Sequence, residues 1–242
     1  MEDRRTALVT GAGRRIGRAI AVALGGRGMH VAVHYSRSDA GARETAAEIE
    51  RAGGRATCLQ GDLSRPETPA ALIDHAVRAL GHLDVLVNSA AVMVRTPIGE
   101  VTTAEWDEMF AINLRAPFFA CQAAAPHLAR RNGTIVNLAD LAAFETWPAY
   151  VPHGMTKAGI VQMTRALARA LAPEIRVNAV APGTVLLPES WSEDTAQRLA
   201  SSTPLRRLGS PQDVTQAVLF LVESDYITGE TIIVDGGRHI RR

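Results

Sequence analysis

Between residues 140 and 157 lie side chains that can move a proton or hold charge, among them Asp140, Tyr150, His153 and Lys157. Residues three or four apart on a helix share a face, so a helix here places Tyr150, His153 and Lys157 side by side. A carboxylate near an imidazole stabilises its protonated form, which can then act as a general acid. The stretch predicts an acid–base site with His153 as proton donor and Tyr150 as a second candidate.

A second chemical signal is the glycine-rich turn that follows the first apolar run. Gly11, Gly13 and Gly17 stand between a predicted strand over 6–10 and a helical pattern over 18–24. Glycines allow close approach of the backbone, and a helix N-terminus offers N–H donors to an anion. This order predicts a dinucleotide phosphate site that includes Arg14, Arg15 and Ile16. The alternative is a tight strand-to-helix turn that binds nothing.

The end of the second predicted strand indicates which dinucleotide is bound. It reads His34-Tyr35-Ser36-Arg37-Ser38 and contains no acidic residue that would bond the adenosine ribose of NAD. Arg37 and Ser38, with Arg14, instead offer charge and a hydroxyl to a 2′-phosphate. We therefore expect NADP(H), whereas the alternative is that Arg37 is a solvated loop charge.

Seven short apolar runs predict strands, and helical patterns separate them. Strands are expected over 6–10, 29–34, 55–60, 83–87, 134–138, 176–180 and 230–235, and helices over 18–24, 39–53, 67–80, 103–130, from the Lys157 region to about 171, and over 211–223. The helix over 103–130 should be interrupted near Pro117 and Pro126. This alternation predicts one doubly wound parallel α/β sheet with helices on both faces, hence a single domain over 1–242.

Several polar residues fall where strands end, and ligands bind at that edge of such a sheet. Asp62 and Leu63 follow the third strand, and Asp62 either contacts adenine or caps a helix. The turn Asn88-Ser89-Ala90 should pass over the cofactor. Asn113 lies among apolar residues, so it is either a helix-kink device or part of a site. The segment over about 184–210 should shape a substrate pocket, with Leu186, Leu187 and Trp191 available to cover it.

Composition excludes several classes of protein. The formal net charge is +1, which gives no reason to expect nucleic acid or an anionic membrane as partner. Cys58 and Cys121 lie far apart, and the seven histidines are scattered, so no metal site is expected. The cysteines indicate reduced thiols in a cytoplasmic protein, and no apolar run reaches transmembrane length.

Taken together, these motifs resemble the short-chain dehydrogenase/reductase family over nearly the whole chain. The matching features are Thr10-Gly11 to Gly17, Asp62-Leu63, the Asn88 turn, Asn113, the strand ending at Asp140, Lys157, Pro182-Gly183 and the terminal run from Ile227 to Gly237. The resemblance implies a Rossmann fold, a homotetramer (or homodimer), and a cofactor site that includes Pro182 and Gly183. It also implies that Asn113 orients Lys157 through water and that Lys157 holds the nicotinamide ribose.

Within the family the chain is most similar to the pteridine reductase branch. Arg15 takes the place of the middle glycine of the loop, the His34–Ser38 run is similar to that branch's phosphate motif, and Asp140 replaces the family's serine. His153 stands where the family has its catalytic tyrosine. Residues near Val92-Met93 replace an aromatic residue that stacks the pterin, although Phe144, Trp147 or Trp191 can supply a flat wall.

These expectations define a leading function and two alternatives. The leading function is an NADPH-dependent reductase of a carbonyl or conjugated C=N bond in a small molecule, such as a ketone or a pterin-like heterocycle. Asp140 and His153 together then replace the family's serine–tyrosine pair. The alternatives are a 3-oxoacyl reductase, and an NADP(H)-binding protein without catalysis because of His153.

Overall fold

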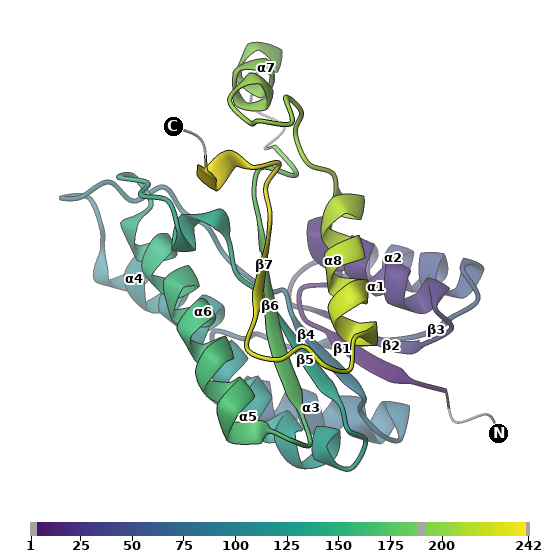
Figure 1. Cartoon of the computed structure of the whole chain (residues 1–242). Coiled ribbons are helices and arrows are strands. Elements are labelled where there is room, and N and C mark those ends of the chain that lie inside the picture. Colours follow the sequence, from purple (N-terminus) through teal and green to yellow (C-terminus); the bar gives the residue numbers. More distant parts are fainter. Residues whose placement is uncertain (1–3, 188–191, 241–242) are drawn as a thin grey trace.

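The computed structural model describes residues 4–187 and 192–240 and is built on one parallel sheet (Figure 1). Its strands are β1 (Thr6–Val9), β2 (His30–Tyr35), β3 (Arg55–Gln60), β4 (Val85–Asn88), β5 (Thr134–Leu138), β6 (Arg176–Pro182) and β7 (Thr231–Val234). They lie in the order β3-β2-β1-β4-β5-β6-β7, all parallel. The predicted seven-stranded fold is confirmed, with strand ends shifted by one or two residues.

Helices cover both faces of this sheet, as Figure 1 shows. On one face lie α1 (Arg15–Gly26), α2 (Asp39–Arg51) and α8 (Pro211–Glu223), and on the other lie α3 (Thr68–Leu80), α5 (Ala116–Ala129) and α6 (Val151–Leu171). Side chains of alternate strand residues pack into the two hydrophobic cores, one on each face of the sheet. Leu8 packs with α3 and α5, whereas Val9 packs with α1 and α8. This period of two is what a sheet buried on both sides requires.

Local sequence fixes where several helices begin. Helix α4 (Thr103–Phe110) starts with a capping box between Thr102 and Glu105, and α8 starts with one between Ser210 and Asp213. Each box satisfies two backbone donors at the first turn. The segment predicted to shape a pocket contains α7 (Glu193–Ser201), which stands apart from the sheet in Figure 1. Trp191, one of its expected covering residues, lies outside the described residues.

The long helix expected over 103–130 is divided differently from the prediction. A π-helical turn, Ala111–Arg115, separates α4 from α5 and lies just before Pro117. The expected interruption at Pro126 is wrong, because α5 continues through it to Ala129. One face of α5 is buried in the core on both sides of the proline, and this packing outweighs the backbone hydrogen bond that proline cannot make.

No helix among the described residues is both long and apolar enough to cross a membrane.

Candidate active site

Two pockets adjoin at the carboxyl-terminal edge of the sheet, near the β1–β4 boundary where the strand order reverses direction. The glycine-loop pocket has a volume of about 640 Å³, and the acid–base pocket one of about 670 Å³. Five residues line both: Arg15, Ile16, Ser89, Ala91 and Val92. A ligand extending from one pocket therefore enters the other.

The two pockets collect most of the residues predicted from the sequence. The glycine-loop pocket is lined by Gly11, Arg14, Arg15, Ile16, Gly17, His34, Tyr35, Ser36, Arg37, Ser38, Asp62, Leu63, Ser89 and Ala90. The acid–base pocket is lined by Asp140, Tyr150, His153, Lys157, Pro182 and Gly183. Asn88 and Asn113 line neither pocket.

The glycine loop is packed so closely that it has no room for side chains. A Cβ on Gly11 would lie 2.8 Å from the Ala90 Cα, and one on Gly17 would lie 2.3 Å from the Gly11 carbonyl oxygen. Helix α1 begins directly after this loop, with no side chain capping it and no acidic residue in its first turn. Its first N–H groups therefore face the pocket without a competing anion, which fits a dinucleotide pyrophosphate.

His34 is buried at the end of β2 and holds the glycine loop against the end of β3. Its Nδ1 atom accepts a hydrogen bond from the Gly11 N–H at 3.1 Å. The ring proton must then lie on Nε2, which donates to the Gly61 carbonyl at 3.1 Å. Burial lowers the pKa of His34 to about 4, so the imidazole is neutral at pH 7 and both bonds persist. Its expected contact with the cofactor stays a prediction.

Thr10 fixes the turn that closes the glycine-loop pocket from the β4 side. Its hydroxyl accepts hydrogen bonds from the Ser89 N–H at 2.9 Å and the Ala90 N–H at 3.0 Å. Asn88 belongs to the core instead, where its amide donates to the Asn137 side-chain oxygen at 2.9 Å. The Asn88 side chain thus joins β4 to β5, and only its neighbours line the pocket.

At the far end of the glycine-loop pocket, two arginines bring positive charge, and the Asp62 carboxylate in the same wall interacts with one of them, Arg37. Arg14 and Arg37 are exposed and line the pocket, together with Ser38. The acidic residue that follows, Asp39, accepts hydrogen bonds from Tyr35 (2.7 Å) and from its helical neighbour Arg43 (2.8 Å) and does not line the pocket. The arrangement fits a 2′-phosphate.

Asp62 forms a local turn at the end of β3. One of its carboxylate oxygens accepts from the Ser64 N–H at 3.0 Å and the Ser64 hydroxyl at 2.7 Å, and these bonds lower the pKa of Asp62. The alternative that Asp62 caps a helix is wrong, because α3 begins at Thr68 with Glu67 in the cap position. The turn leaves Asp62 in the wall of the glycine-loop pocket.

Lys157 lies in the wall of the acid–base pocket with its stem buried. Its Nζ atom donates to the Leu138 carbonyl at 2.8 Å, which ties α6 to the end of β5. Burial lowers the pKa of Lys157, and the neighbouring Asp140 carboxylate opposes this shift. A lysine ammonium has three donors, so two N–H groups remain for a ligand.

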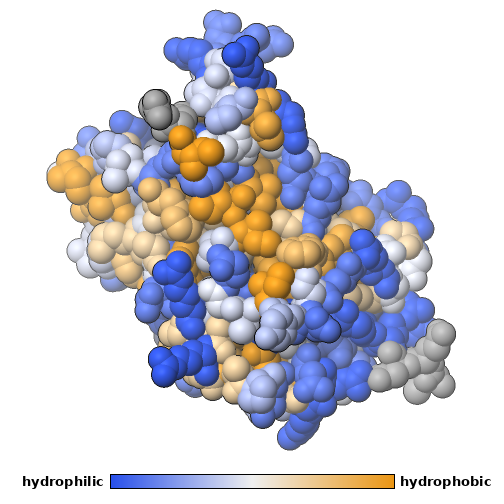
Figure 2. Space-filling view, in the orientation of Figure 1, coloured by the Kyte–Doolittle hydropathy of each residue, from blue (hydrophilic) through white to orange (hydrophobic). Residues whose placement is uncertain are grey.

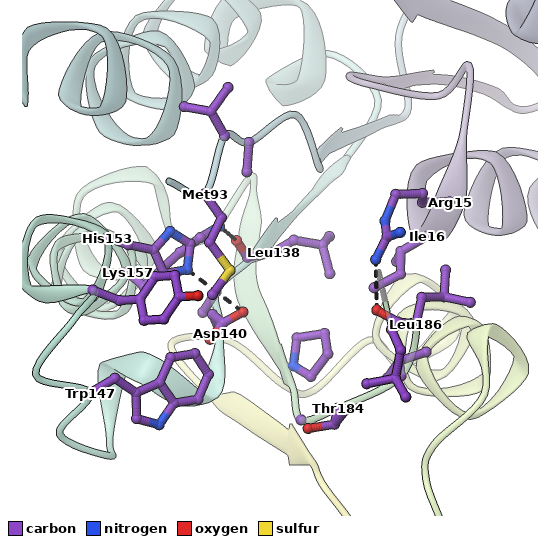
Figure 3. A pocket seen from close by; sticks show the side chains of 18 of the residues that line it. Arg15, Ile16, Met93, Leu138, Asp140, Trp147, His153, Lys157, Thr184 and Leu186 are labelled. Atoms are coloured by element: carbon purple, nitrogen blue, oxygen red, sulfur yellow. Dashed lines mark hydrogen bonds and ion pairs between the residues drawn. The ribbon is translucent and has the colours of Figure 1, made fainter. Parts of the chain in front are cut away.

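His153 and Asp140 face one another across the same pocket (Figure 3). His153 Nε2 lies 3.8 Å from Asp140 Oδ2, and the His153 side chain is 2% exposed against 25% for Asp140. Neither ring nitrogen of His153 has a hydrogen-bond partner among the described residues. Asp140 is oriented by its other oxygen, which accepts from the Ala142 N–H at 2.8 Å. A buried imidazole without a partner, facing a pocket, is suited to bonding a ligand.

Tyr150 lines this pocket one helical turn before His153, at the cap position of α6. Its ring meets Trp147 edge-on, with centroids 6.2 Å apart, and Trp147 also lines the pocket. The predicted flat wall is therefore supplied by Trp147. Phe144 is half exposed and does not line the pocket.

Asn113 sits in the π-helical turn and supports the pocket wall from behind. Its side-chain oxygen accepts from the Val92 N–H at 2.8 Å, and its amide donates to the Val92 carbonyl at 2.8 Å. The amide also contacts the Thr156 hydroxyl at 3.3 Å, which itself donates to the His153 carbonyl at 2.7 Å. Asn113 thus positions Val92 between the two pockets. Its expected role in orienting Lys157 stays a prediction.

Arg15 connects the two pockets and adopts a conformation that favours glycine, with φ of 53°. Its guanidinium donates to the Leu186 carbonyl at 2.7 Å (Figure 3). The segment after β6 is thereby tied to the glycine loop, and Leu186 and Leu187 line the acid–base pocket as predicted.

Sequence reasoning missed Arg238, which lines the acid–base pocket. Met93 and Thr184, from segments expected near the substrate, line it as well. Met93 lies beside His153 in Figure 3. Arg238 comes from the C-terminal tail, directly after the terminal Asp-Gly-Gly motif. That motif signals a turn, and a turn at a strand's carboxyl end was the available clue that the next side chain returns to the site.

Comparison with known proteins agrees with this geometry. A family model described as enoyl-(acyl carrier protein) reductase matches residues 11–239. A 3beta-hydroxysteroid dehydrogenase of Eggerthella lenta is 36% identical, with 96% of this chain and 93% of that protein covered. A putative ketoacyl reductase of granaticin polyketide synthase from Streptomyces violaceoruber is 37% identical (97% and 96% covered). The 3-oxoacyl-(acyl-carrier-protein) reductase FabG of Staphylococcus aureus is 35% identical (99% and 100% covered).

Solved structures give the same result. A putative short-chain alcohol dehydrogenase from Sinorhizobium meliloti superposes with a TM-score of 0.93 at 41% identity, covering 98% of this chain and 97% of that one. The angucycline C-6 ketoreductase LanV, solved with bound NADP, superposes with a TM-score of 0.91 at 34% identity (98% and 96% covered). A family match over nearly the whole length, with relatives of this similarity, shows that the chain belongs to the short-chain dehydrogenase/reductase family of oxidoreductases.

Proposed function

We propose that this protein is an NADPH-dependent reductase of a carbonyl group in a small, largely apolar organic molecule. One observation carries the proposal. The glycine-loop pocket, which fits a dinucleotide, opens into a second pocket whose wall holds Lys157, His153 and Asp140. A bound nicotinamide ring and a substrate carbonyl would meet where the two pockets join, beside groups that can hold charge and give a proton.

The chemistry divides between cofactor and protein. Bound NADPH supplies the hydride that is added to the carbonyl carbon. The His153 imidazolium gives a proton to the developing alkoxide, and the Asp140 carboxylate stabilises that imidazolium. Lys157, held by the Leu138 carbonyl, keeps two N–H groups free for the nicotinamide ribose and adds positive charge to the site.

The choice of NADPH rests on Arg14 and Arg37. Both line the end of the glycine-loop pocket where the 2′-phosphate of NADPH would lie, and Asp39 is engaged elsewhere. Guanidinium groups bind phosphate through paired N–H donors. The related ketoreductase LanV was solved with NADP, which is consistent with this choice.

A ketone is favoured over a pterin-like heterocycle or another C=N substrate. The relatives described above are named for keto or hydroxyl groups, and none of them for a pterin. Val92 and Met93 also stand where the pteridine reductase branch has a stacking aromatic residue. Trp147, Tyr150, Leu186 and Leu187 line the acid–base pocket, so an apolar ketone with a flat ring system fits it best.

A 3-oxoacyl thioester is the second candidate substrate. It is supported by the similarity to FabG, which covers 99% of this chain. A thioester chain would leave the pocket past Arg95, which is exposed at its rim. Acetoacetyl-CoA is the probe that separates this candidate from a ring ketone.

We further propose that the protein assembles with copies of itself, as a homotetramer or homodimer. Strand β7 is an edge strand, and half-buried apolar residues run along it beside Phe220, which is 52% exposed on α8. Figure 2 shows apolar side chains gathered over this part of the surface. Phe118 and Phe119, each 40% exposed on α5, mark a second apolar face. Light scattering of the purified protein tests this assembly.

The experiment that tests the function combines binding and turnover. NADPH binding is measured by its fluorescence, and NADPH consumption is followed with ring ketones, diketones, acetoacetyl-CoA and pterins at several pH values. Binding together with turnover of a ring ketone supports the proposal. Binding with turnover of acetoacetyl-CoA alone selects the second candidate, and a protein that does not bind NADPH contradicts both.

A further inference from the structure

The C-terminal turn after β7 is built to bring one side chain back over the sheet edge. The Asp235 carboxylate accepts hydrogen bonds from the Gly237 N–H at 2.8 Å and the His239 N–H at 2.7 Å. Gly236 and Gly237 have φ values of 65° and 83°, a region that other residues rarely adopt. A Cβ on Gly183 would lie 2.7 Å from the Asp235 Cβ, so a glycine at the end of β6 is needed for the turn to pack there.

Arg238, which follows this turn, joins three segments of the acid–base pocket. Its Nη2 and Nε atoms donate to the two Glu145 carboxylate oxygens at 2.9 and 3.3 Å. Its Nη1 atom donates to the Thr184 hydroxyl at 3.0 Å, and its guanidinium lies 5.6 Å from the centre of the Trp147 ring. The segments after β5, β6 and β7 are thus linked by one side chain.

Trp147 is held from two sides by this arrangement. Its indole N–H donates to the same Glu145 oxygen that Arg238 Nη2 contacts, at 2.9 Å. The Arg238 guanidinium lies over its ring, and Tyr150 meets it edge-on. In Figure 3, Trp147 and Thr184 lie along one border of the pocket, and Asp140 lies between Trp147 and His153.

The ion pair itself is shielded from water, with 12% of the Arg238 side chain and 16% of the Glu145 side chain exposed. Removing two charges from water costs desolvation free energy, which offsets much of their mutual attraction. A shielded pair therefore adds little to the stability of the fold, and its main effect is to fix the geometry of the groups that it joins. A bidentate guanidinium–carboxylate pair allows few orientations. The pair therefore fixes the position of the indole that forms the pocket wall.

We propose that Arg238 is a positioning residue that determines which substrates the pocket accepts, because through Glu145 it holds Trp147 as a rigid wall. This proposal rests on the proposed reductase function. A flat bicyclic ketone lies against the wall and depends on it. A small diketone reaches the reacting groups without touching Trp147 and does not depend on it.

The first test compares Arg238→Met with the wild-type enzyme on two probes, β-tetralone and diacetyl. We expect the KM for β-tetralone to rise about tenfold, since charge-assisted hydrogen bonds are lost, while kcat changes less than about twofold. The KM for diacetyl and the Kd for NADPH should not change. Arg207→Met is the matched control, because it removes a bidentate pair with Asp213 (2.9 and 2.9 Å) that does not line the pocket.

The second test measures the solvent accessibility of Trp147 and requires no substrate turnover. In a Trp106→Phe, Trp191→Phe background, acrylamide quenching reports the accessibility of Trp147 alone. Quenching should increase in Arg238→Met and Glu145→Gln and stay unchanged in Arg207→Met. If Arg238→Met fails to fold, the same KM and quenching measurements are made on Arg238→Lys. A lysine keeps the positive charge but cannot hydrogen-bond to Glu145 and Thr184 simultaneously in the geometry of arginine.

The outcomes separate this inference from the proposed function. A wild-type protein that reduces no carbonyl contradicts the function, and quenching then still decides whether Arg238 holds Trp147. Active variants with wild-type KM for β-tetralone and wild-type quenching overturn the inference. An equal rise of KM for both probes also overturns it, because a general loss of structure would have that effect.

Discussion

The Nε2 atom of His153 lies 3.8 Å from the Oδ2 atom of Asp140, across a pocket that Lys157 also lines. Asp140 is fixed at the end of β5 by the Ala142 N–H, and His153 is fixed in the first turns of α6. A small movement that shortens this distance to about 3 Å would complete a charge-assisted hydrogen bond between the two groups. The predicted pairing of His153 as proton donor with Asp140 as stabilising anion stays a prediction, because 3.8 Å is longer than a hydrogen bond.

Replacing His153 by alanine should lower kcat for a ring ketone by about 10²- to 10⁴-fold, because the proposed general acid is lost. The Kd for NADPH should change little, since the glycine loop, Arg14 and Arg37, which are proposed to hold the dinucleotide, are left in place. Tyr150→Phe is the matched comparison, and a larger loss there than in His153→Ala would assign the donor to Tyr150.

Replacing Asp140 by asparagine should shift the alkaline limb of NADPH binding to lower pH. Burial lowers the pKa of Lys157, and the Asp140 carboxylate opposes that effect. Without the carboxylate the pKa of Lys157 falls further, so its ammonium group is lost at a lower pH. The Kd for NADPH, measured by fluorescence across a pH series, reports this. Coincident profiles for the two proteins would show that Lys157 does not sense Asp140.

His34 should make the folded protein sensitive to acid. Burial lowers the pKa of its imidazole from the ordinary value of 6.5, which the unfolded chain retains, to about 4 in the folded protein. Between these pH values the unfolded chain binds a proton that the folded chain does not, so the free energy of unfolding falls as pH decreases, by up to about 3 kcal/mol. Urea unfolding at a series of pH values measures the slope. His34→Asn should flatten it, whereas substitution of the exposed His75 should not.

Gly17→Ala should abolish NADPH binding, because the new methyl group would lie 2.3 Å from the Gly11 carbonyl oxygen and displace the loop. Gly26→Ala is its control at the other end of α1, where a Cβ meets nothing within 4 Å. That substitution should retain binding and stabilise the protein by about 0.5–1 kcal/mol. NADPH binding by Gly17→Ala at the wild-type Kd would contradict the assignment of the glycine loop as the pyrophosphate-binding site.

Arg37→Ala should raise the Kd for NADPH by about tenfold or more, since a charge-assisted contact with the 2′-phosphate is lost, and leave the Kd for NADH nearly unchanged. Arg51→Ala removes an exposed arginine at the C-terminal end of α2, whereas Arg37 lies just before the N-terminal end of that helix, and it serves as control. Equal effects on both cofactors would show that Arg37 does not read the 2′-phosphate.

The order of elements could be predicted from the sequence because it follows from local patterns. Apolar runs of strand length, helical periodicity and the glycine turn after 6–10 are properties of neighbouring residues, and they predict a doubly wound sheet. The same patterns place Lys157 four residues after His153 on one helix face. They cannot predict that α5 continues through Pro126, because the packing of the buried face of α5 against the core determines whether the helix is interrupted there.

Which side chains meet was decided by the tertiary structure. The motifs led us to expect that Asn113, Asn88 and His34 act at the site. The tertiary structure shows that their side chains bond Val92, Asn137 and Gly11, and their roles toward the cofactor stay predictions. Arg238 was not predicted at all, because its partners Glu145 and Thr184 are distant in sequence. The sequence by itself determined the sheet, the glycine loop and the His153–Lys157 spacing, which depend on contacts within a few residues. Only the tertiary structure decided the pocket walls, because these form where the ends of separate strands converge.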